Sequence, residues 1–211
     1  MKNNNIPQVL VSHPKDKAYH HGDLRNALLV AAELELKENG LERFSLRGVA
    51  RAAGVSHAAP THHFGDVQGL LTALTAVGFV RLLKVQQKRQ KKADKDPLEQ
   101  LVAAGLGYIE FAQNNSEMLH LMFASSLPKH DSADLSQSAE AAFENLVVLV
   151  NKVSGDESAQ NMSDVYGPWV LVHGFSALLN ANRLPSLSSS KITRDAELHA
   201  ILKRFFTAIL N

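Results

Sequence analysis

The sequence predicts an all-α protein, and three observations support this prediction. In one segment after another, apolar residues recur three and four positions apart, which lays an apolar stripe along one face of a helix. Clusters rich in glycine, proline, asparagine and serine separate these segments. No part of the 211 residues reads as a convincing strand. We therefore expect a few short helices followed by a larger helical bundle.

The composition excludes several classes of site. The chain has no cysteine, which removes disulfides, iron–sulfur clusters, thiolate zinc sites and cysteine nucleophiles. Neither GxSxG, a phosphate-binding P-loop nor GxGxxG occurs, so we expect neither an enzyme nor a cofactor. Residues 1–11 lack a long apolar run, and residues 165–182 contain glycine, proline, histidine and asparagine. A secretory signal and a membrane span are therefore not expected, and the predicted location is the cytoplasm.

The first two helices have clear start and stop signals. Residues 1–18 are expected to be a flexible arm. The first helix is predicted from Asp23, a candidate N-cap, to Gly40, with its apolar stripe at Leu24, Ala27, Leu28, Ala31 and Leu34. The second begins after the N-cap Ser45 and ends at Gly54, with its stripe at Leu46, Val49, Ala50 and Ala53.

A very short third helix is predicted from His57 to His63, capped by Ser56 and closed by Phe64-Gly65-Asp66. Pro60 is tolerable only near its first turn. A fourth helix is expected from about Asp66 to Lys92. Five further helices are expected after Pro97, over residues 97–114, 116–126, 134–154, 158–182 and 193–210.

The most informative stretch is Ser45 to Phe64, SLRGVARAAGVSHAAPTHHF. Two short helices meet at Ala53-Gly54-Val55, and the small residues of the first allow the second to pack close against it. The second is too short to add much core, so its polar side chains His57, Thr61, His62 and His63 are expected to face outward. An ordinary helical hairpin and a helix presented to the major groove of DNA both fit this pattern. The basic balance of residues 1–95 favours DNA, but the run Lys84–Lys95 also reads as a solvated helix face.

Residues 19–82 resemble the N-terminal domain of TetR-family regulators throughout their length. YHHGDLRNALLVAA resembles the first helix of one branch of that family, and GVARAAGVSHAAPTHHFGDVQGLLTAL resembles its helix-turn-helix and the start of its fourth helix. Further on, PWVLVHGFSALL resembles the Trp-His-Gly signature of the WHG class of C-terminal domains. The resemblance implies a helix-turn-helix domain over residues 19–66, with the fourth helix starting there and continuing to about 82, and a ligand-binding and dimerisation domain over 83–211. It also implies a ligand-responsive repressor that binds a near-palindromic operator in double-stranded DNA.

The resemblance also implies roles for individual residues. Phosphates would be contacted by Ser45, Arg47, Tyr19 or His20, and His63. Base edges and thymine methyl groups would be contacted by His57, Ala58, Thr61 and His62, behind the capping Ser56.

Three positions depart from the family pattern. Many relatives have tyrosine at Thr61, lysine at Val67 and glutamate at Gly48. The first two departures remove a groove contact and a phosphate contact. The third removes a capping box with Ser45 and places a glycine within a helix, at a cost of about 1 kcal/mol. The sequence therefore predicts weaker and less salt-dependent DNA binding than that of a typical relative.

A small-molecule effector site is predicted in the C-terminal bundle. Trp169 and His173 share a helix face, and two preceding helices supply flexible and aromatic side chains. Such residues equally well fill an ordinary core. If they line a pocket, the candidate ligand-binding residues are Tyr108, Phe111, Met118, His120, Met122, Phe123, Trp169 and His173, with His120 or His173 as the polar anchor.

A homodimer is expected because the last two helices are apolar on more than one face, and a second copy would bury the surplus.

The ten histidines leave a metal-responsive regulator or a metal-binding helical protein as the alternative function. Adjacent pairs such as His20-His21 and His62-His63 point about 100° apart on a helix and cannot easily share one ion. We therefore expect no metal site.

Overall fold

The protein is all-α in the part of the chain that the computed structural model describes: residues 21–155, 162–184, 187 and 190–210, without the side chains of 21–23 and 191. Every regular element in these residues is an α-helix, which confirms the predicted fold class. The elements are α1 (His21–Asn39), α2 (Leu46–Ala53), α3 (Ala59–Phe64), α4 (Val67–Gln90), α5 (Pro97–Asn114), α6 (Ser116–Phe123), α7 (Ala133–Ser154), α8 (Met162–Asn180) and α9 (Lys191–Leu210).

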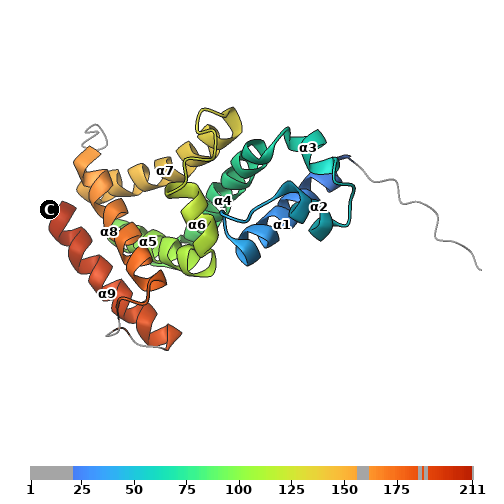
Figure 1. Ribbon diagram of the computed structural model, residues 1–211. Helices are drawn as coiled ribbons and strands as arrows, with labels where there is room; N and C mark the ends of the chain where they lie inside the picture. Colours follow the sequence, from blue (N-terminus) through green and yellow to red (C-terminus); the bar gives the residue numbers. More distant parts are fainter. Residues whose placement is uncertain (1–20, 156–161, 185–186, 188–189, 211) are drawn as a thin grey trace, which may run out of the picture.

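The helices form two groups that α4 joins (Figure 1). We call α1–α3 the head and α5–α9 the bundle. Helix α4 packs against α1 and α3 of the head and against α5, α6 and α7 of the bundle. Helices α8 and α9 lie at the end of the molecule opposite α2 and α3 (Figure 1). An event in the bundle can therefore reach the head through α4 or through α6, which contacts both α1 and α4.

Caps and breaks explain most helix bounds. Asp66 caps α4 by accepting a hydrogen bond from Gly69 N at 2.7 Å, and Asp96 caps α5 through Glu99 N at 3.1 Å. Gly40 and Gly155 follow their helices with φ of 67° and 72°, the left-handed conformation that glycine adopts at little cost.

Helix α6 ends three residues earlier than predicted. The segment after it instead binds to α4, because Gln68 donates to the carbonyl of Leu127 at 2.9 Å and the backbone N–H of Lys129 donates to Thr72 Oγ1 at 2.9 Å. Pro128, buried at this point, disfavours helical backbone at Leu127.

Helix α4 is long and apolar enough to cross a membrane, and it is the one helix of the described residues that passes this test. Half of its most apolar window is buried inside the protein, and Leu70, Leu71 and Leu74 are fully enclosed in the core. Its apolarity is therefore accounted for by its position between the head and the bundle.

An ion pair between Arg81 and Glu33 joins α4 to the head. The guanidinium of Arg81 forms a two-pronged ion pair with the Glu33 carboxylate on α1, in which Nη2 and Oε2 are 2.7 Å apart. Arg81 also reaches Asn115 Oδ1, at the start of α6, at 3.5 Å. This single side chain of α4 therefore contacts α1 in the head and the residue that precedes α6.

Candidate functional sites

The turn between α2 and α3 has the predicted glycine geometry. Gly54 has a φ of 67°, and Val55 N–H donates to the carbonyl of Ala50 at 3.0 Å, which closes the end of α2. Within the described part of the chain, no atom beyond the neighbouring residues lies within 4 Å of a Cβ placed at Gly54, so backbone conformation rather than crowding requires glycine here. The inner face of α2 is small and buried, at Gly48, Val49 and Ala50.

Ser45 caps the N-terminus of α2 and is itself linked to two residues of α1. Ser45 Oγ accepts from Gly48 N at 3.1 Å, as predicted, and donates to Glu35 Oε1 on α1 at 3.2 Å. Glu35 also accepts from Asn39 Nδ2 at 3.1 Å and is only 5% exposed. The Ser45 hydroxyl predicted to contact a phosphate is therefore already used to hold α2 against α1.

Helix α3 begins two residues later than predicted. It starts at Ala59, and no side chain caps it, so the prediction that Ser56 is its N-cap is wrong. His57 and Ala58 instead lie in a turn in which Ala59 N–H donates to the Ser56 carbonyl at 3.0 Å. The reason is Pro60, which is accommodated in the first turn of a helix, where its missing N–H has no partner to lose.

The polar side chains of this segment are presented outward. His57, Ala58, Thr61 and His62 are exposed, as are Ser56 and Arg47, while His63 is half-buried. Pro60 is buried and faces the protein. Tyr19 and His20, two further candidates for phosphate contact, lie outside the described residues.

The other side of α3 is fixed to its neighbours. Phe64 packs against the core, and the Arg25 guanidinium of α1 stacks over its ring at 5.1 Å from the centroid. Gly69 of α4 lies so close that an added Cβ would be 2.0 Å from the Phe64 carbonyl oxygen. A short helix braced in this way can hold an exposed row of side chains in a fixed orientation.

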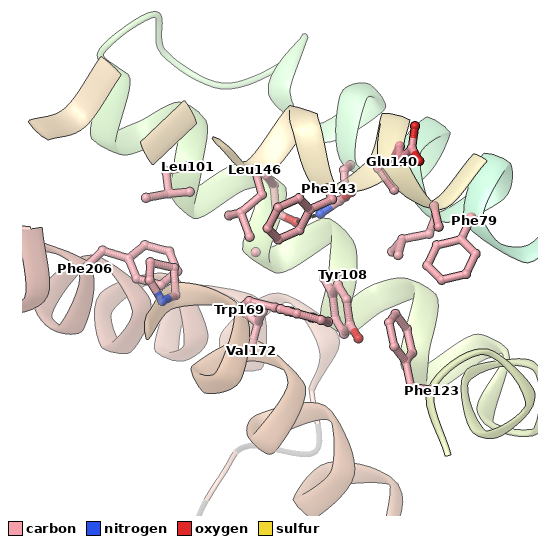
Figure 2. Close-up of a pocket in the computed structure, with 17 residues that line it drawn as sticks. Phe79, Leu101, Tyr108, Phe123, Glu140, Phe143, Leu146, Trp169, Val172 and Phe206 are labelled. Carbon is pink, nitrogen blue, oxygen red and sulfur yellow. Dashed lines mark hydrogen bonds between the residues drawn. The ribbon is translucent and has the colours of Figure 1, made fainter. Parts of the chain in front are cut away.

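A second candidate site is a cavity of about 330 Å³ inside the bundle. Its wall is formed by α4, α5, α7, α8 and α9, with Phe123 from the end of α6, and Figure 2 shows aromatic rings from several helices gathered around it. The residues that line it are Phe79, Leu82, Gln86, Leu101, Ala104, Gly105, Tyr108, Phe123, Ala139, Glu140, Ala142, Phe143, Leu146, Pro168, Trp169, Val172 and Phe206.

One end of the cavity carries a hydrogen-bonded aromatic cluster. Tyr108 Oη and His173 Nδ1 are 2.8 Å apart, and Phe123 packs against both Tyr108 and Trp169 with ring centroids 6.1 Å apart in each pair. Burial raises the pKa of Tyr108, although a hydrogen bond with Trp169 acts in the opposite direction. The Tyr108 phenol is therefore neutral at physiological pH and can donate to His173.

The structure brings some of the predicted ligand-binding residues together and separates others. Tyr108, Phe123 and Trp169 line the cavity, and His173 lies behind Tyr108. Phe111, Met118 and Met122 are buried but do not line it, and the two methionines pack against Gly78 of α4. His120 is exposed and likewise does not line the cavity, so it does not serve as the polar anchor considered above.

Sequence reasoning missed the contributions of α4 and α7 to the cavity. Gln86 gave a recognisable signal, because it continues the apolar face of α4 after Phe79 and Leu82 at spacings of three and four. A glutamine at such a position is buried, and here it is 8% exposed. Phe143 and Leu146 gave no comparable signal, because an apolar side chain at helical spacing fits a core equally well.

No group of three or more histidine, cysteine, aspartate or glutamate side chains that could hold a metal ion occurs among the described residues. Of the predicted histidine pairs, His62 and His63 have ring centroids 5.4 Å apart and ring planes at 77°. His20-His21 lies outside the described side chains.

Comparison with known proteins places both sites in one family. Residues 28–74 match the model for bacterial regulatory proteins of the tetR family, and residues 101–204 match the model for tetracycline repressor-like C-terminal domains. The WHG class that Trp169, His173 and Gly174 indicate fits this C-terminal family. Together the two models cover most of the chain.

Individual relatives agree with the family models. A solved protein of unknown function from Rhodococcus sp. RHA1 is 30% identical over 93% of this chain and all of its own length, with a TM-score of 0.76. The TetR-family regulator PfmR from Thermus thermophilus shares the fold at 16% identity over 87% of this chain and 96% of its own, with a TM-score of 0.60. A curated relative, the HTH-type transcriptional regulator BetI of Paraburkholderia phytofirmans, is 28% identical over 103 residues, 48% of this chain and about half (53%) of its own length. This chain belongs to the TetR family of DNA-binding transcriptional regulators.

Proposed function

We propose that the protein is a ligand-responsive repressor that binds a near-palindromic operator as a homodimer. The observation that carries this proposal is the exposure of His57, just before α3, and of Thr61 and His62 on α3, a short helix braced from behind by α1, α2 and α4. Residues 19–66 would be the DNA-binding domain and residues 83–211 the ligand-binding and dimerisation domain, acting in the cytoplasm. Residues 1–18 would be an arm beside the DNA-binding domain.

In this proposal α3 enters the major groove. The turn at His57 and Ala58 and the first turns of α3, with Thr61 and His62, would contact base edges. Arg47 and His63 would contact phosphates on either side, together with Ser56 and, by family resemblance, Tyr19 or His20. Ser45 would act indirectly, because its hydroxyl holds α2 in place through Glu35.

Dimerisation would use α8 and α9, which pack against each other and leave large apolar side chains exposed. Val170 is 67% exposed, and Leu178, Phe205 and Ile209 are 46%, 47% and 38% exposed. Gly174 lies one turn from Val170, and no described atom beyond its own stretch of α8 lies within 4 Å of a Cβ placed on it, which leaves room for a partner helix to approach closely. A second copy with the same surface would bury these groups in a two-fold interface.

Ligand response would arise in the cavity. A molecule bound against Phe123 of α6 and Phe79 of α4 touches the two helices that also contact α1 in the head. Such a molecule releases DNA only if it binds better to a dimer whose heads are wrongly spaced than to one that fits the operator. Occlusion of a promoter by the unliganded dimer is the expected mode of repression.

Genomic footprinting with the purified protein, followed by footprinting on the strongest site, tests the proposal. We expect two protected half-sites whose centres lie about 34 Å apart, one turn of DNA or a multiple of it. Light scattering at micromolar concentration should give the mass of a dimer. A monomer in solution, or the absence of any preferred site in dilute salt, would contradict the proposal.

A further inference from the structure

Gln86 stands out in the wall of the bundle cavity. Its side chain is more than nine-tenths buried, and its Oε1 accepts no hydrogen bond within the described part of the chain. The amide Nε2 points the other way and donates to the Ala104 carbonyl at 3.4 Å. This contact fixes the orientation of the amide, because turning it over would place Oε1 against another carbonyl oxygen.

The backbone at Gln86 is held in place by a close helix crossing. A Cβ added to Gly107 of α5 would lie 2.7 Å from Gln86 Cα and 3.0 Å from Gln86 N. Helices α4 and α5 therefore touch through their backbones at this point, and Gln86 cannot withdraw from the cavity wall without separating them. The backbone that carries this free acceptor is therefore fixed, and only the side chain can move.

The other polar groups at the cavity are already paired with protein atoms. The Tyr108 hydroxyl is hydrogen-bonded to His173 Nδ1 at 2.8 Å and interacts with the Trp169 indole. Glu140 is exposed and accepts from Ser136 Oγ at 2.9 Å. Among the described residues that line the cavity, none is lysine, arginine or histidine. The wall thus offers no partner for an anion, and Gln86 Oε1 is its one fully buried side-chain acceptor without a hydrogen bond in the described part of the chain.

We infer that the cavity takes a neutral, largely apolar molecule of about ten to fifteen non-hydrogen atoms that donates one hydrogen bond to Gln86 Oε1. The size follows from the cavity volume, about 330 Å³. The apolar part packs on the aromatic rings. Oε1 has less than 1 Å² of accessible surface in the free protein, so the donor reaches it by a small shift of the Gln86 side chain toward the ligand. This inference rests on the proposed ligand-binding role of the bundle and adds the chemistry of the ligand.

A matched set of probes separates the donor from the rest of the molecule. 4-Butylphenol can donate a hydrogen bond, 4-butylanisole can only accept one, and butylbenzene can do neither. 4-Butylbenzoate carries a negative charge and (4-butylphenyl)trimethylammonium a positive one. Binding to the full-length protein is measured by calorimetry and by quenching of Trp169, the one tryptophan of the chain, which lies in the cavity wall.

We expect 4-butylphenol to bind about tenfold more tightly than 4-butylanisole, because the anisole leaves Gln86 Oε1 buried without a donor. The benzoate should bind at least tenfold more weakly than the phenol. In Gln86→Leu the preference for phenol over anisole should fall to within about twofold, while butylbenzene binds as well as before or better. Gln113→Leu, the same change at a half-buried α5 residue that does not line the cavity, should keep the preference.

The outcomes distinguish the proposed ligand chemistry from the proposed ligand-binding role of the bundle. Equal binding of phenol and anisole, or a preference that survives Gln86→Leu, would overturn the donor assignment and leave the ligand-binding cavity intact. If the benzoate or the trimethylammonium probe bound most tightly, the assignment of a neutral ligand would be overturned. Tightest binding of the trimethylammonium probe would point to Glu140 and the aromatic faces as its partners. If no probe binds while the protein still binds its operator, both the ligand chemistry and the sensing role of the bundle fail, but the DNA-binding role stands.

Discussion

The carboxylate of Glu35 occupies the space that a side chain at position 48 would fill. A Cβ added to Gly48 would lie 1.9 Å from Glu35 Oε1, a distance that real contacts do not reach. Sequence comparison with the family suggested only that a capping glutamate is missing at Gly48. The structure shows that α1 supplies a carboxylate to the same N-terminus through Ser45. The glycine is therefore the residue that allows this alternative cap.

We predict that Gly48→Ala destabilises the protein, although alanine is the better helix former by about 1 kcal/mol. The new methyl group displaces the buried Glu35 carboxylate from Ser45 and Asn39, and we expect a net loss of about 1–3 kcal/mol in the free energy of unfolding. Urea unfolding of Gly48→Ala, Glu35→Ala and the double variant measures it. The double variant should be more stable than the two single losses added together; a fully additive result, or no loss in Gly48→Ala, would disprove the assignment.

The pKa of Glu99 predicts a pH dependence of stability. Hydrogen bonds from Lys203 and His199, at 2.6 and 2.7 Å, lower the pKa of this carboxyl group in the folded protein. A lowered folded-state pKa stabilises the fold above the ordinary glutamate pKa of about 4.3, and this contribution disappears as the pH falls through the folded-state value.

Glu99→Gln should therefore be less stable than the natural protein at pH 6–7, and the difference should shrink as the pH falls below about 4. Urea midpoints between pH 3 and pH 7 measure the effect. Glu140→Gln, a change at an exposed glutamate of α7, is the control. A constant difference between Glu99→Gln and the natural protein across this range would show that the ion pairs of Glu99 contribute nothing.

Burial raises the pKa of Tyr108 above its ordinary value of about 10. We therefore predict that the Tyr108 phenol does not ionise during an alkaline titration of the folded protein. The absorbance change on tyrosine ionisation in the folded protein up to about pH 10.5 should be the same for the natural chain and Tyr108→Phe. The two curves should separate only where the protein unfolds. Because the raised pKa favours the neutral phenol in the folded state, this contribution to stability is complete below pH 10 and is lost as the pH rises.

Val67 offers a test in which DNA binding improves. It is exposed at the first position of α4, beside α3, where many relatives have a lysine. Val67→Lys should strengthen operator binding, and each new phosphate contact should steepen the slope of log affinity against log salt by about 0.9. Val80→Lys, on the same helix but farther from α3 and 42% exposed, is the matched control. If both variants gave the same slope, α4 would not begin near the phosphate backbone.

How much could be read from the sequence depended on whether a local signal existed. The cap Ser45, the start of α4 near Asp66 and the break at Gly54 were predictable, because each depends on backbone signals within a few residues. The start of α3 was not, because Pro60 moved it past an apparently good cap at Ser56. The close contact of Gly48 with Glu35 could not be predicted from local sequence, because Glu35 comes from another helix.

The residues of the cavity likewise divide into those with a local signal in the sequence and those without one. The contribution of α8 was predictable from the Trp169 and His173 pattern, and α4 carries a signal at Gln86, whereas α7 and α9 close the cavity through packing that leaves no local mark in the sequence. Met118 and Met122 were plausible pocket residues by type, but they fill the space beside Gly78 between α6 and α4. Residue type alone does not distinguish a pocket wall from a core; a polar residue on an apolar helix face, such as Gln86, comes closest to doing so.

The central claim is that the exposed side chains around α3 contact DNA, and anisotropy of a labelled operator tests it most directly. The double variant His57→Ala/His62→Ala is compared with His120→Ala/His130→Ala, two exposed histidines outside the head. We predict at least about a tenfold loss of operator affinity in the first variant, since each lost base contact costs about 1–3 kcal/mol, with no loss in the second and unchanged melting temperatures in both. Equal affinity of the two variants would contradict the account.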